Sequence, residues 1–289
     1  MRVFMTGVTG QVGTEILAEL NRRAAQRRRG PSLDIVAPEE SLLDISDRDA
    51  MLAAIGTVQP DVIIHPAAWT AVDACESDPD RAYRVNALGT RYVAEAARLV
   101  GAHVCYLSTD YIFDGTSPRP YLEWDDPNPL SVYGRSKLGG EREIDPGHTI
   151  VRTAWVNGRT GANMVKTVLA LAGQDGNLRF VDDQKGSPTS AADLAGRIVE
   201  LSLGRYAGVF HVTNQGSTTW YEFARLVLGV AGFDPGRVEP ISTKELNPPR
   251  PAPRPANSVL DNAALRLSGW DLLPDWQDAI TQLVVELTA

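Results

Sequence analysis

The stretch TGVTGQVG, residues 6 to 13, lies between an apolar, strand-like segment and a segment with helical periodicity. Gly7 permits a tight turn, Gly10 lets the backbone approach a pyrophosphate, and Gly13 lets the helix pack closely on the strand. The free N–H groups at the start of that helix then face the phosphates. In this strand–turn–helix setting the stretch predicts a dinucleotide site, and the alternative is a glycine-rich turn without a ligand.

The residues after the expected second strand bear on the choice between NAD and NADP. They are PEESLLDIS, 38 to 46, and their carboxylates favour a ribose hydroxyl over a 2′-phosphate, which favours NAD. NADP stays open as the coenzyme for two reasons. Glu39 and Glu40 can point outward, and the arginines in the basic segment at 22 to 29 can reach the site. The glycine stretch lacks a Walker A lysine, so we expect no hydrolysis of nucleoside triphosphates.

Strand-like and helical segments alternate through the first half of the chain. The expected strands are 2–6, 33–38, 61–68, 103–109 and 148–156, and the expected helices are 14–26, 47–55, 79–100, one that starts near Pro129, and 162–173. This alternation predicts an α/β fold, a Rossmann-like doubly wound parallel sheet with helices on both faces. Such sheets bind ligands outside the carboxyl ends of their strands.

The alternation becomes looser in the second half of the chain. We therefore expect a dinucleotide-binding domain at 1–156 and a mainly substrate-binding cap at 157–289. Short strands are expected at 178–182 and 208–213, and part of the second one returns to the main sheet. Helices are expected at 190–203, 219–231 and 275–287.

Composition excludes several classes of function. The chain has 289 residues, 43% of them hydrophobic, and a net charge of -8, which argues against general affinity for nucleic acid or an anionic membrane. The basic run at 22–30 is expected to end a helix and to face water. Cys75 and Cys105 have neither metal-ligand spacing nor a disulfide framework, which favours a reducing, cytoplasmic setting. We expect neither a signal peptide nor a membrane span.

The stretch SVYGRSK places Tyr133 four residues before Lys137, so both lie on one face if a helix forms there. An ammonium group beside a phenol is expected to lower the tyrosine pKa. Tyrosine can then pass a proton to a carbonyl oxygen as hydride arrives from a nicotinamide. Ser108 and Thr109, at the carboxyl end of the fourth strand, offer hydroxyls to fix that carbonyl, and capping and turn chemistry are the alternative roles for them.

These motifs resemble the extended short-chain dehydrogenase/reductases, and within them the dTDP-4-dehydrorhamnose reductases. Seven stretches carry the resemblance in family order over nearly the whole chain: TGVTGQVG, HPAAWTAVDACES, VNALGT, STDYIFDG, VYGRSKLGGE, VRTAWV and DDQKGSPT. The resemblance implies that Tyr133 is the proton donor, Lys137 its partner and Thr109 the third catalytic residue. The residues expected at the coenzyme, NADPH or NADH, are Gly7, Gly10, Gln11, Val12, Gly13, Asp44, Ile45, Ala67, Ala68, Thr70, Tyr133 and Lys137. Those expected at the sugar nucleotide are Val72, Thr109, Asp110, Tyr111 and Trp155.

Several positions depart from the family pattern. Trp69 and Asn157 lie near the expected pocket where many members carry other residues, so the exact sugar stays open. Some members dimerise through a magnesium site built from glutamates. Glu15 and Glu286 are suitably placed for it, but Ala192 replaces a further glutamate. We therefore expect no metal, and a monomer or a weak homodimer.

The implied reaction is reduction of the C4 ketone of a dTDP-4-keto-6-deoxy-L-hexose, which converts dTDP-4-dehydrorhamnose to dTDP-L-rhamnose. One alternative is the same reduction on another dTDP-linked deoxysugar in a secondary-metabolite pathway. A second alternative is a non-catalytic regulatory subunit of methionine adenosyltransferase. Loss of the Tyr–Lys pair or of the threonine would favour that second alternative, and this chain has all three residues.

Overall fold

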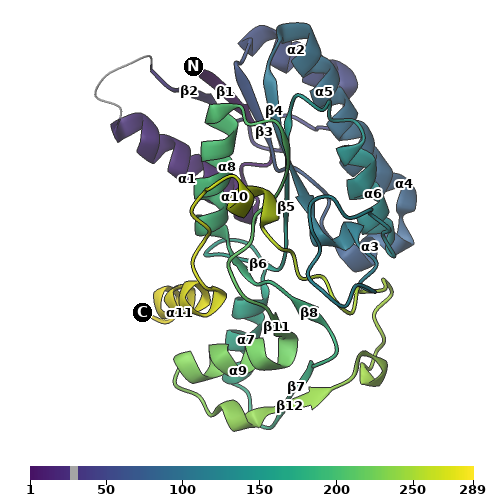
Figure 1. The fold of residues 1–289 in the computed structure, drawn as a ribbon, viewed down its shortest axis with the longest axis vertical. Helices are drawn as coiled ribbons and strands as arrows, with labels where there is room; N and C mark the ends of the chain where they lie inside the picture. The colour runs from purple at the N-terminus through teal and green to yellow at the C-terminus, as the bar shows by residue number, and fades with distance from the viewer. Residues whose placement is uncertain (27–31) are drawn as a thin grey trace.

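A six-stranded sheet forms the centre of the larger lobe of the computed structural model, which describes residues 1–26 and 32–289 (Figure 1). The strand order is β10–β5–β4–β3–β1–β2, and every neighbouring pair is parallel. The strands are β1 (Arg2–Met5), β2 (Asp34–Val36), β3 (Val62–His65), β4 (His103–Thr109), β5 (Thr149–Thr153) and β10 (Gly208–His211). The predicted doubly wound parallel sheet is therefore confirmed. Its strand order reverses between β1 and β3, where such sheets bind ligands.

Helices cover both faces of this sheet (Figure 1). One face carries α1 (Gln11–Gln26), α8 (Ala191–Gly204) and α10 (Ala263–Leu267), and the other carries α2 (Arg48–Val58), α5 (Gly89–Val100) and α6 (Val132–Glu141). The strands are apolar on both faces because each face is buried. In β1, Val3 and Met5 join the core under α1 and α8, while Phe4 joins the core under α2 and α5.

A smaller lobe lies below the sheet in Figure 1 and has an apolar core of its own. It contains α7 (Met164–Ala172), α9 (Trp220–Val230), α11 (Trp276–Thr288), and the strand pair β7 (Leu178–Val181) and β12 (Val238–Ile241). Short strands join the lobes: β6 (Val156–Asn157), β8 (Lys185–Gly186), β9 (Thr189–Ser190) and β11 (Thr218–Thr219). Across residues 1–26 and 32–289, no helix is both long and apolar enough to cross a membrane.

Some element boundaries differ from the sequence-based expectation. The helix after the glycine stretch begins at Gln11, so Gly13 lies inside its first turn. The long helix expected at 79–100 is divided into α4 (Pro79–Tyr83), a π-helical turn (Arg84–Leu88) and α5, preceded by α3 (Val72–Ser77). Pro129 does not start α6, because Ser131 is its N-cap and accepts a hydrogen bond from the backbone N–H of Gly134. Residues 27–31, which include the end of the basic run, lie outside the described part of the chain.

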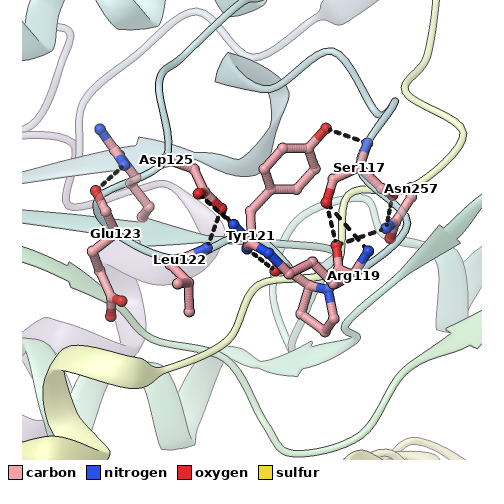
Figure 2. Close-up of polar contacts among 9 residues, drawn as sticks. Ser117, Arg119, Tyr121, Leu122, Glu123, Asp125 and Asn257 are labelled. Atoms are coloured by element: carbon pink, nitrogen blue, oxygen red, sulfur yellow. Dashed lines mark hydrogen bonds and ion pairs between the residues drawn. The ribbon is translucent and has the colours of Figure 1, made fainter.

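The end of the proline-rich stretch at 247–258 and the residue that follows it are tied to a turn far from them in sequence. Figure 2 shows Asn257 beside Ser117 and Arg119, and its side-chain amide donates to both of their carbonyl oxygens, at 2.8 and 3.2 Å. The backbone N–H of Tyr121 donates to the carbonyl of Val259 at 2.8 Å. These contacts hold the C-terminal part of the chain against the larger lobe, beside the segment that follows β4.

Candidate active site

A cavity of about 760 Å³ opens at the carboxyl ends of the central strands. Every residue predicted from the sequence to contact coenzyme or substrate lines it: Gly7, Gly10, Gln11, Val12, Gly13, Asp44, Ile45, Ala67, Ala68, Thr70, Val72, Thr109, Asp110, Tyr111, Tyr133, Lys137 and Trp155. The carboxyl-end rule accounts for this convergence, because segments that follow β1 to β5 all meet at one edge of the sheet.

The glycine turn fits the pyrophosphate of a dinucleotide. Gly7 has φ +60°, and a Cβ there would lie 2.8 Å from the Cα of Ala67, so glycine lets the ends of β1 and β3 approach closely. A Cβ on Gly13 would lie 1.9 Å from the carbonyl oxygen of Gly7. The first N–H groups of α1 have no partner within the helix, and its first residues line the cavity. This cradle is suited to phosphate oxygens.

The cavity continues along the segment expected to meet the adenosine. The Asp44 carboxylate accepts from the N–H and the hydroxyl of Ser46, both at 2.8 Å, which holds it in place. Ile45 is buried and lies against Gly89 of α5. Glu39 and Glu40 are both exposed, and Glu40 lines the cavity whereas Glu39 does not. One of the two glutamates is therefore placed to influence the choice of coenzyme.

The arginines at the end of α1 were the other feature expected to bear on that choice. Arg22 and Arg23 both bind the carboxylate of Glu19, with 2.6 Å contacts. Neither of these two side chains lines the cavity. The remaining arginines of the run, at 27–29, lie outside the described residues. In this structure Arg22 and Arg23 stabilise α1 through i,i+3 and i,i+4 ion pairs.

Close packing of α6 brings its tyrosine to the end of β4. A Cβ on Gly134 would lie 2.1 Å from the carbonyl oxygen of Tyr111, so only glycine allows the first turn of α6 to lie against this segment. The Tyr111 and Tyr133 rings meet edge to face, with centroids 5.7 Å apart. Thr109 caps the short helical turn that follows β4 and accepts from the N–H of Tyr111 at 3.2 Å. Thr109 and Tyr133 thus line the same end of the cavity.

The expected effect of the lysine on the tyrosine pKa is not found. Burial raises the pKa of Tyr133 well above its usual value, and the Thr109 side chain is the group that lowers it. The ammonium group of Lys137 donates to the carbonyl oxygen of Leu107 at 2.7 Å and lies 4.1 Å from the centroid of the Tyr106 ring. Burial lowers the pKa of Lys137 to about 7. The buried lysine is therefore bound to the backbone and titrates near neutral pH.

Three polar side-chain atoms in the cavity wall have no hydrogen-bond partner within the described chain. They are Ser108 Oγ, Asp110 Oδ2 and Thr153 Oγ1, and all three are buried. Burial raises the pKa of Asp110 to about 6, and its other oxygen accepts from the Thr109 hydroxyl at 3.1 Å. Buried polar atoms normally have partners, so these three are suited to bind a polar ligand. The sequence did not lead us to predict Thr153 as a site residue, although its position at the carboxyl end of β5 could have indicated that it lies at the cavity.

Aromatic residues make up much of the remaining wall. Trp69 lines the cavity and lies under the guanidinium of Arg81, 4.5 Å from the ring centroid. Asn157 does not line the cavity; its side-chain amide donates to the carbonyl oxygen of Trp155 at 2.8 Å. Trp220, from the smaller lobe, also lines the cavity. No motif in the sequence indicated Trp220, because it reaches the site only through the packing of the two lobes.

The glutamates of the family's magnesium site do not fit a cation in this chain. The Glu15 carboxylate is buried and accepts two hydrogen bonds from the Arg159 guanidinium, at 3.1 and 2.9 Å. The negative charge of Glu286 acts on the same guanidinium. Within residues 1–26 and 32–289, no three His, Cys, Asp or Glu side chains are grouped so that they could hold a metal ion. The arginine supplies the positive charge at this position.

Fold and site together define an extended short-chain dehydrogenase/reductase. The family model described as RmlD substrate binding domain matches residues 1–289. A dTDP-4-dehydrorhamnose reductase from Streptomyces griseus is 40% identical over 97% of this chain and 92% of that protein. A dTDP-4-keto-6-deoxy-D-glucose reductase from Streptomyces niveus is 38% identical, covering 100% of this chain and 98% of its own. The crystal structure of dTDP-4-dehydrorhamnose reductase from Bacillus anthracis in complex with NADP has a TM-score of 0.91 and 38% identity over 99% of both chains. The chain belongs to the dTDP-4-dehydrorhamnose reductase family.

Proposed function

We propose that this chain uses NADPH or NADH to reduce the C4 ketone of a dTDP-4-keto-6-deoxy-L-hexose, converting dTDP-4-dehydrorhamnose to dTDP-L-rhamnose. The observation that carries this proposal is a single cavity that joins the glycine turn to Thr109, Tyr133 and Lys137. The relatives from Streptomyces griseus and Bacillus anthracis are both dTDP-4-dehydrorhamnose reductases, which supports the substrate, and the NADP bound to the latter supports the coenzyme.

The chain's own residues hold both reactants and supply one proton. The coenzyme, when bound, supplies the hydride to C4. The start of α1 holds its pyrophosphate, Asp44 and Ile45 flank its adenosine, and Ala67, Ala68 and Thr70 line its path. Lys137 donates to the ribose beside the nicotinamide.

The chemistry at the ketone needs one proton and one hydrogen-bond donor. When the substrate binds, the Thr109 hydroxyl turns from the Asp110 carboxylate, to which it donates in the structure, and donates to the C4 oxygen instead. Tyr133 gives its phenolic proton to that oxygen as the hydride reaches C4. Burial keeps the tyrosine protonated until charge develops on the oxygen, because it disfavours the phenolate.

The sugar nucleotide lies along the opposite side of the cavity. Val72, Tyr111 and Trp155 supply apolar surface to the C–H groups of a deoxysugar. The unpartnered oxygen of Asp110 and the neighbouring Ser108 hydroxyl supply polar contacts. A wall of this mixed character is suited to a ring that carries both hydroxyl and methyl groups.

Substitution of the proton donor tests the mechanism. We expect Tyr133→Phe to lower kcat by a factor of about 10² to 10⁴, the usual contribution of general acid catalysis. Coenzyme binding, measured by titration, should fall far less than kcat, because Tyr133 is one of many residues expected at the coenzyme and the others are unchanged. Near-normal turnover in a well-folded Tyr133→Phe variant would show that another group donates the proton.

The alternative substrate is another dTDP-linked deoxysugar in a secondary-metabolite pathway. It is supported by the Streptomyces niveus relative, a dTDP-4-keto-6-deoxy-D-glucose reductase, and by Trp69 in the cavity wall. Turnover assays on a panel of dTDP-4-keto sugars, with NMR of each product, distinguish the two substrates.

The organisation of the protein is part of the same proposal. Residues 1–156 form the coenzyme-binding domain, and 157–289 form mainly the substrate domain, with segments such as β10 in the main sheet. We propose that the chain works in the cytoplasm as a monomer or weak homodimer, without a metal, and binds neither nucleic acid nor membrane. The buried, free thiols of Cys75 and Cys105 support a reducing compartment.

A further inference from the structure

Two tryptophans from different lobes stack in the cavity wall. Trp155 follows β5 of the main sheet, and Trp220 is the first residue of α9 in the smaller lobe. Their rings lie face to face, with centroids 3.5 Å apart and an interplanar angle of 4°. Both side chains line the cavity that contains Thr109 and Tyr133. The stack therefore connects the smaller lobe directly to the wall of the reaction site.

The backbone of Trp155 is held in an unfavourable conformation. Its φ of +44° lies in the left-handed region, which a bulky residue rarely adopts. Two neighbours hold this turn: the N–H of Thr189 and the side-chain amide of Asn157 both donate to the Trp155 carbonyl oxygen, at 3.1 and 2.8 Å. Strained backbone conformations persist where several surrounding contacts fix them, and they cluster at ligand-binding sites.

The surroundings of the indole are shaped to receive it. A Cβ on Gly186 would lie 2.3 Å from the Trp155 ring, so glycine is required beside the indole edge. Behind Trp220, the fully buried ring of Phe223 meets it edge to face, with centroids 5.6 Å apart. A continuous row of packed rings thus runs from the core of the smaller lobe to the cavity wall.

We propose that Trp220 is a positioning residue for the reduction. Its indole stacks on that of Trp155 and holds it at the cavity wall, although the Trp155 backbone is in the unfavourable left-handed conformation. The sugar therefore meets an apolar surface that is already formed. This inference rests on the proposed function, because it assumes that Trp155 faces the sugar nucleotide. The smaller lobe thereby gains a role in the reaction, because its Trp220 fixes the position of Trp155, which the larger lobe supplies.

The test compares Trp220→Ala, Trp220→Phe and a control in the same core. An aromatic pair contributes a factor of a few to about ten beyond its buried area. We therefore expect Trp220→Ala to raise the KM for the keto sugar nucleotide about fivefold to tenfold, while kcat and the KM for the coenzyme stay within about twofold. Trp220→Phe should recover most of the loss, because a smaller ring still stacks.

The control separates positioning from loss of stability. Leu283 belongs to the same lobe core, is buried, does not line the cavity and is not part of the row of rings. Leu283→Ala should lower Tm without changing the KM for the sugar nucleotide. If Trp220→Ala leaves that KM unchanged, or lowers kcat and raises both KM values in parallel as Tm falls, the positioning role is refuted.

A crystal structure of Trp220→Ala keeps the inference testable without turnover. We expect the Trp155 indole to leave its position, and the φ of Trp155 to move out of the left-handed region. An unchanged Trp155 would overturn the proposal. If the wild-type chain fails to reduce any dTDP-4-keto sugar, the proposed function fails, whereas the position of Trp155 in this variant still decides whether Trp220 holds it.

Discussion

A buried ion pair joins the helix that carries Tyr133 and Lys137 to the central sheet. Glu141, the last residue of α6, accepts two hydrogen bonds from Arg152 of β5, at 3.0 and 2.8 Å. The side chains are only 5% and 6% exposed for the arginine and the glutamate. The arginine also donates to the carbonyl oxygen of Glu123 at 3.2 Å, in the segment drawn in Figure 2. Removal of the glutamate charge leaves the guanidinium buried with no counter-ion in this network.

We expect Glu141→Gln to lower the free energy of unfolding by about 3–5 kcal/mol, the usual cost of a buried charge that loses its partner. The pair itself need not be stabilising, since its desolvation offsets much of the attraction. The double variant Glu141→Leu with Arg152→Met should therefore lie within about 1–2 kcal/mol of the wild type. Asp145→Asn is the control: it breaks the exposed Arg98–Asp145 pair, with side chains 49% and 47% exposed, and should cost at most about 1 kcal/mol.

The assay is urea unfolding followed by circular dichroism, with the free energy taken from the midpoint and slope. Glu141 also raises the pKa of Lys137, so the glutamine variant should lower that pKa further, which a shift in the pH profile of kcat/KM would report. The reasoning is refuted if Glu141→Gln costs no more than Asp145→Asn. It is also refuted if the double variant is as unstable as the single one.

Two further predictions concern the same helix. Gly134→Ala should lower the free energy of unfolding by about 1–3 kcal/mol and reduce activity, because the new Cβ would lie 2.1 Å from the Tyr111 carbonyl oxygen. The control is Gly56→Ala in α2, where a Cβ would have nothing within 4 Å, and it should raise the free energy of unfolding by about 0.5–1 kcal/mol. Equal effects of the two variants on the urea midpoint would contradict this prediction. Lys137 loses its proton near pH 7 when folded and near 10.5 when unfolded, so the unfolded chain binds more protons between these values. The difference in free energy of unfolding between the wild type and Lys137→Met should be constant below pH 7. Above pH 7 the wild type should gain at most about 1.4 kcal/mol per pH unit relative to the variant. If this difference does not change up to about pH 10, the lysine stays charged in the folded protein.

Much of the site could be predicted because its residues belong to local motifs at strand ends. The glycine turn at 6–13 is a contiguous pattern, Thr109 ends an apolar strand, and Asp110 directly follows it. In a parallel sheet such positions meet at one edge whatever the detailed packing, so their convergence follows from the order of elements alone. The spacing of Tyr133 and Lys137 is a helical repeat, and it places both side chains on one face of α6.

The errors arose where contacts between distant segments decide the outcome. Pro129 suggested a helix start, but Ser131 is the N-cap and the helix begins three residues later, at Val132. The lysine was expected to lower the tyrosine pKa, yet its ammonium group binds the Leu107 carbonyl oxygen and burial raises that pKa. Both depend on where neighbouring backbone lies, which spacing does not encode.

The sequence by itself determined the class of fold and predicted the dinucleotide turn, because periodicity and local spacing carry that information, while the family resemblance implied the Thr–Tyr–Lys set. Only the tertiary structure decided how Glu141 meets Arg152, how Arg159 pairs with Glu15, and how Trp220 stacks on Trp155. Each of these pairs joins elements from separate parts of the chain. Their energies depend on burial and on distances of a few ångströms, and both exist only once the sheet and the smaller lobe have packed together.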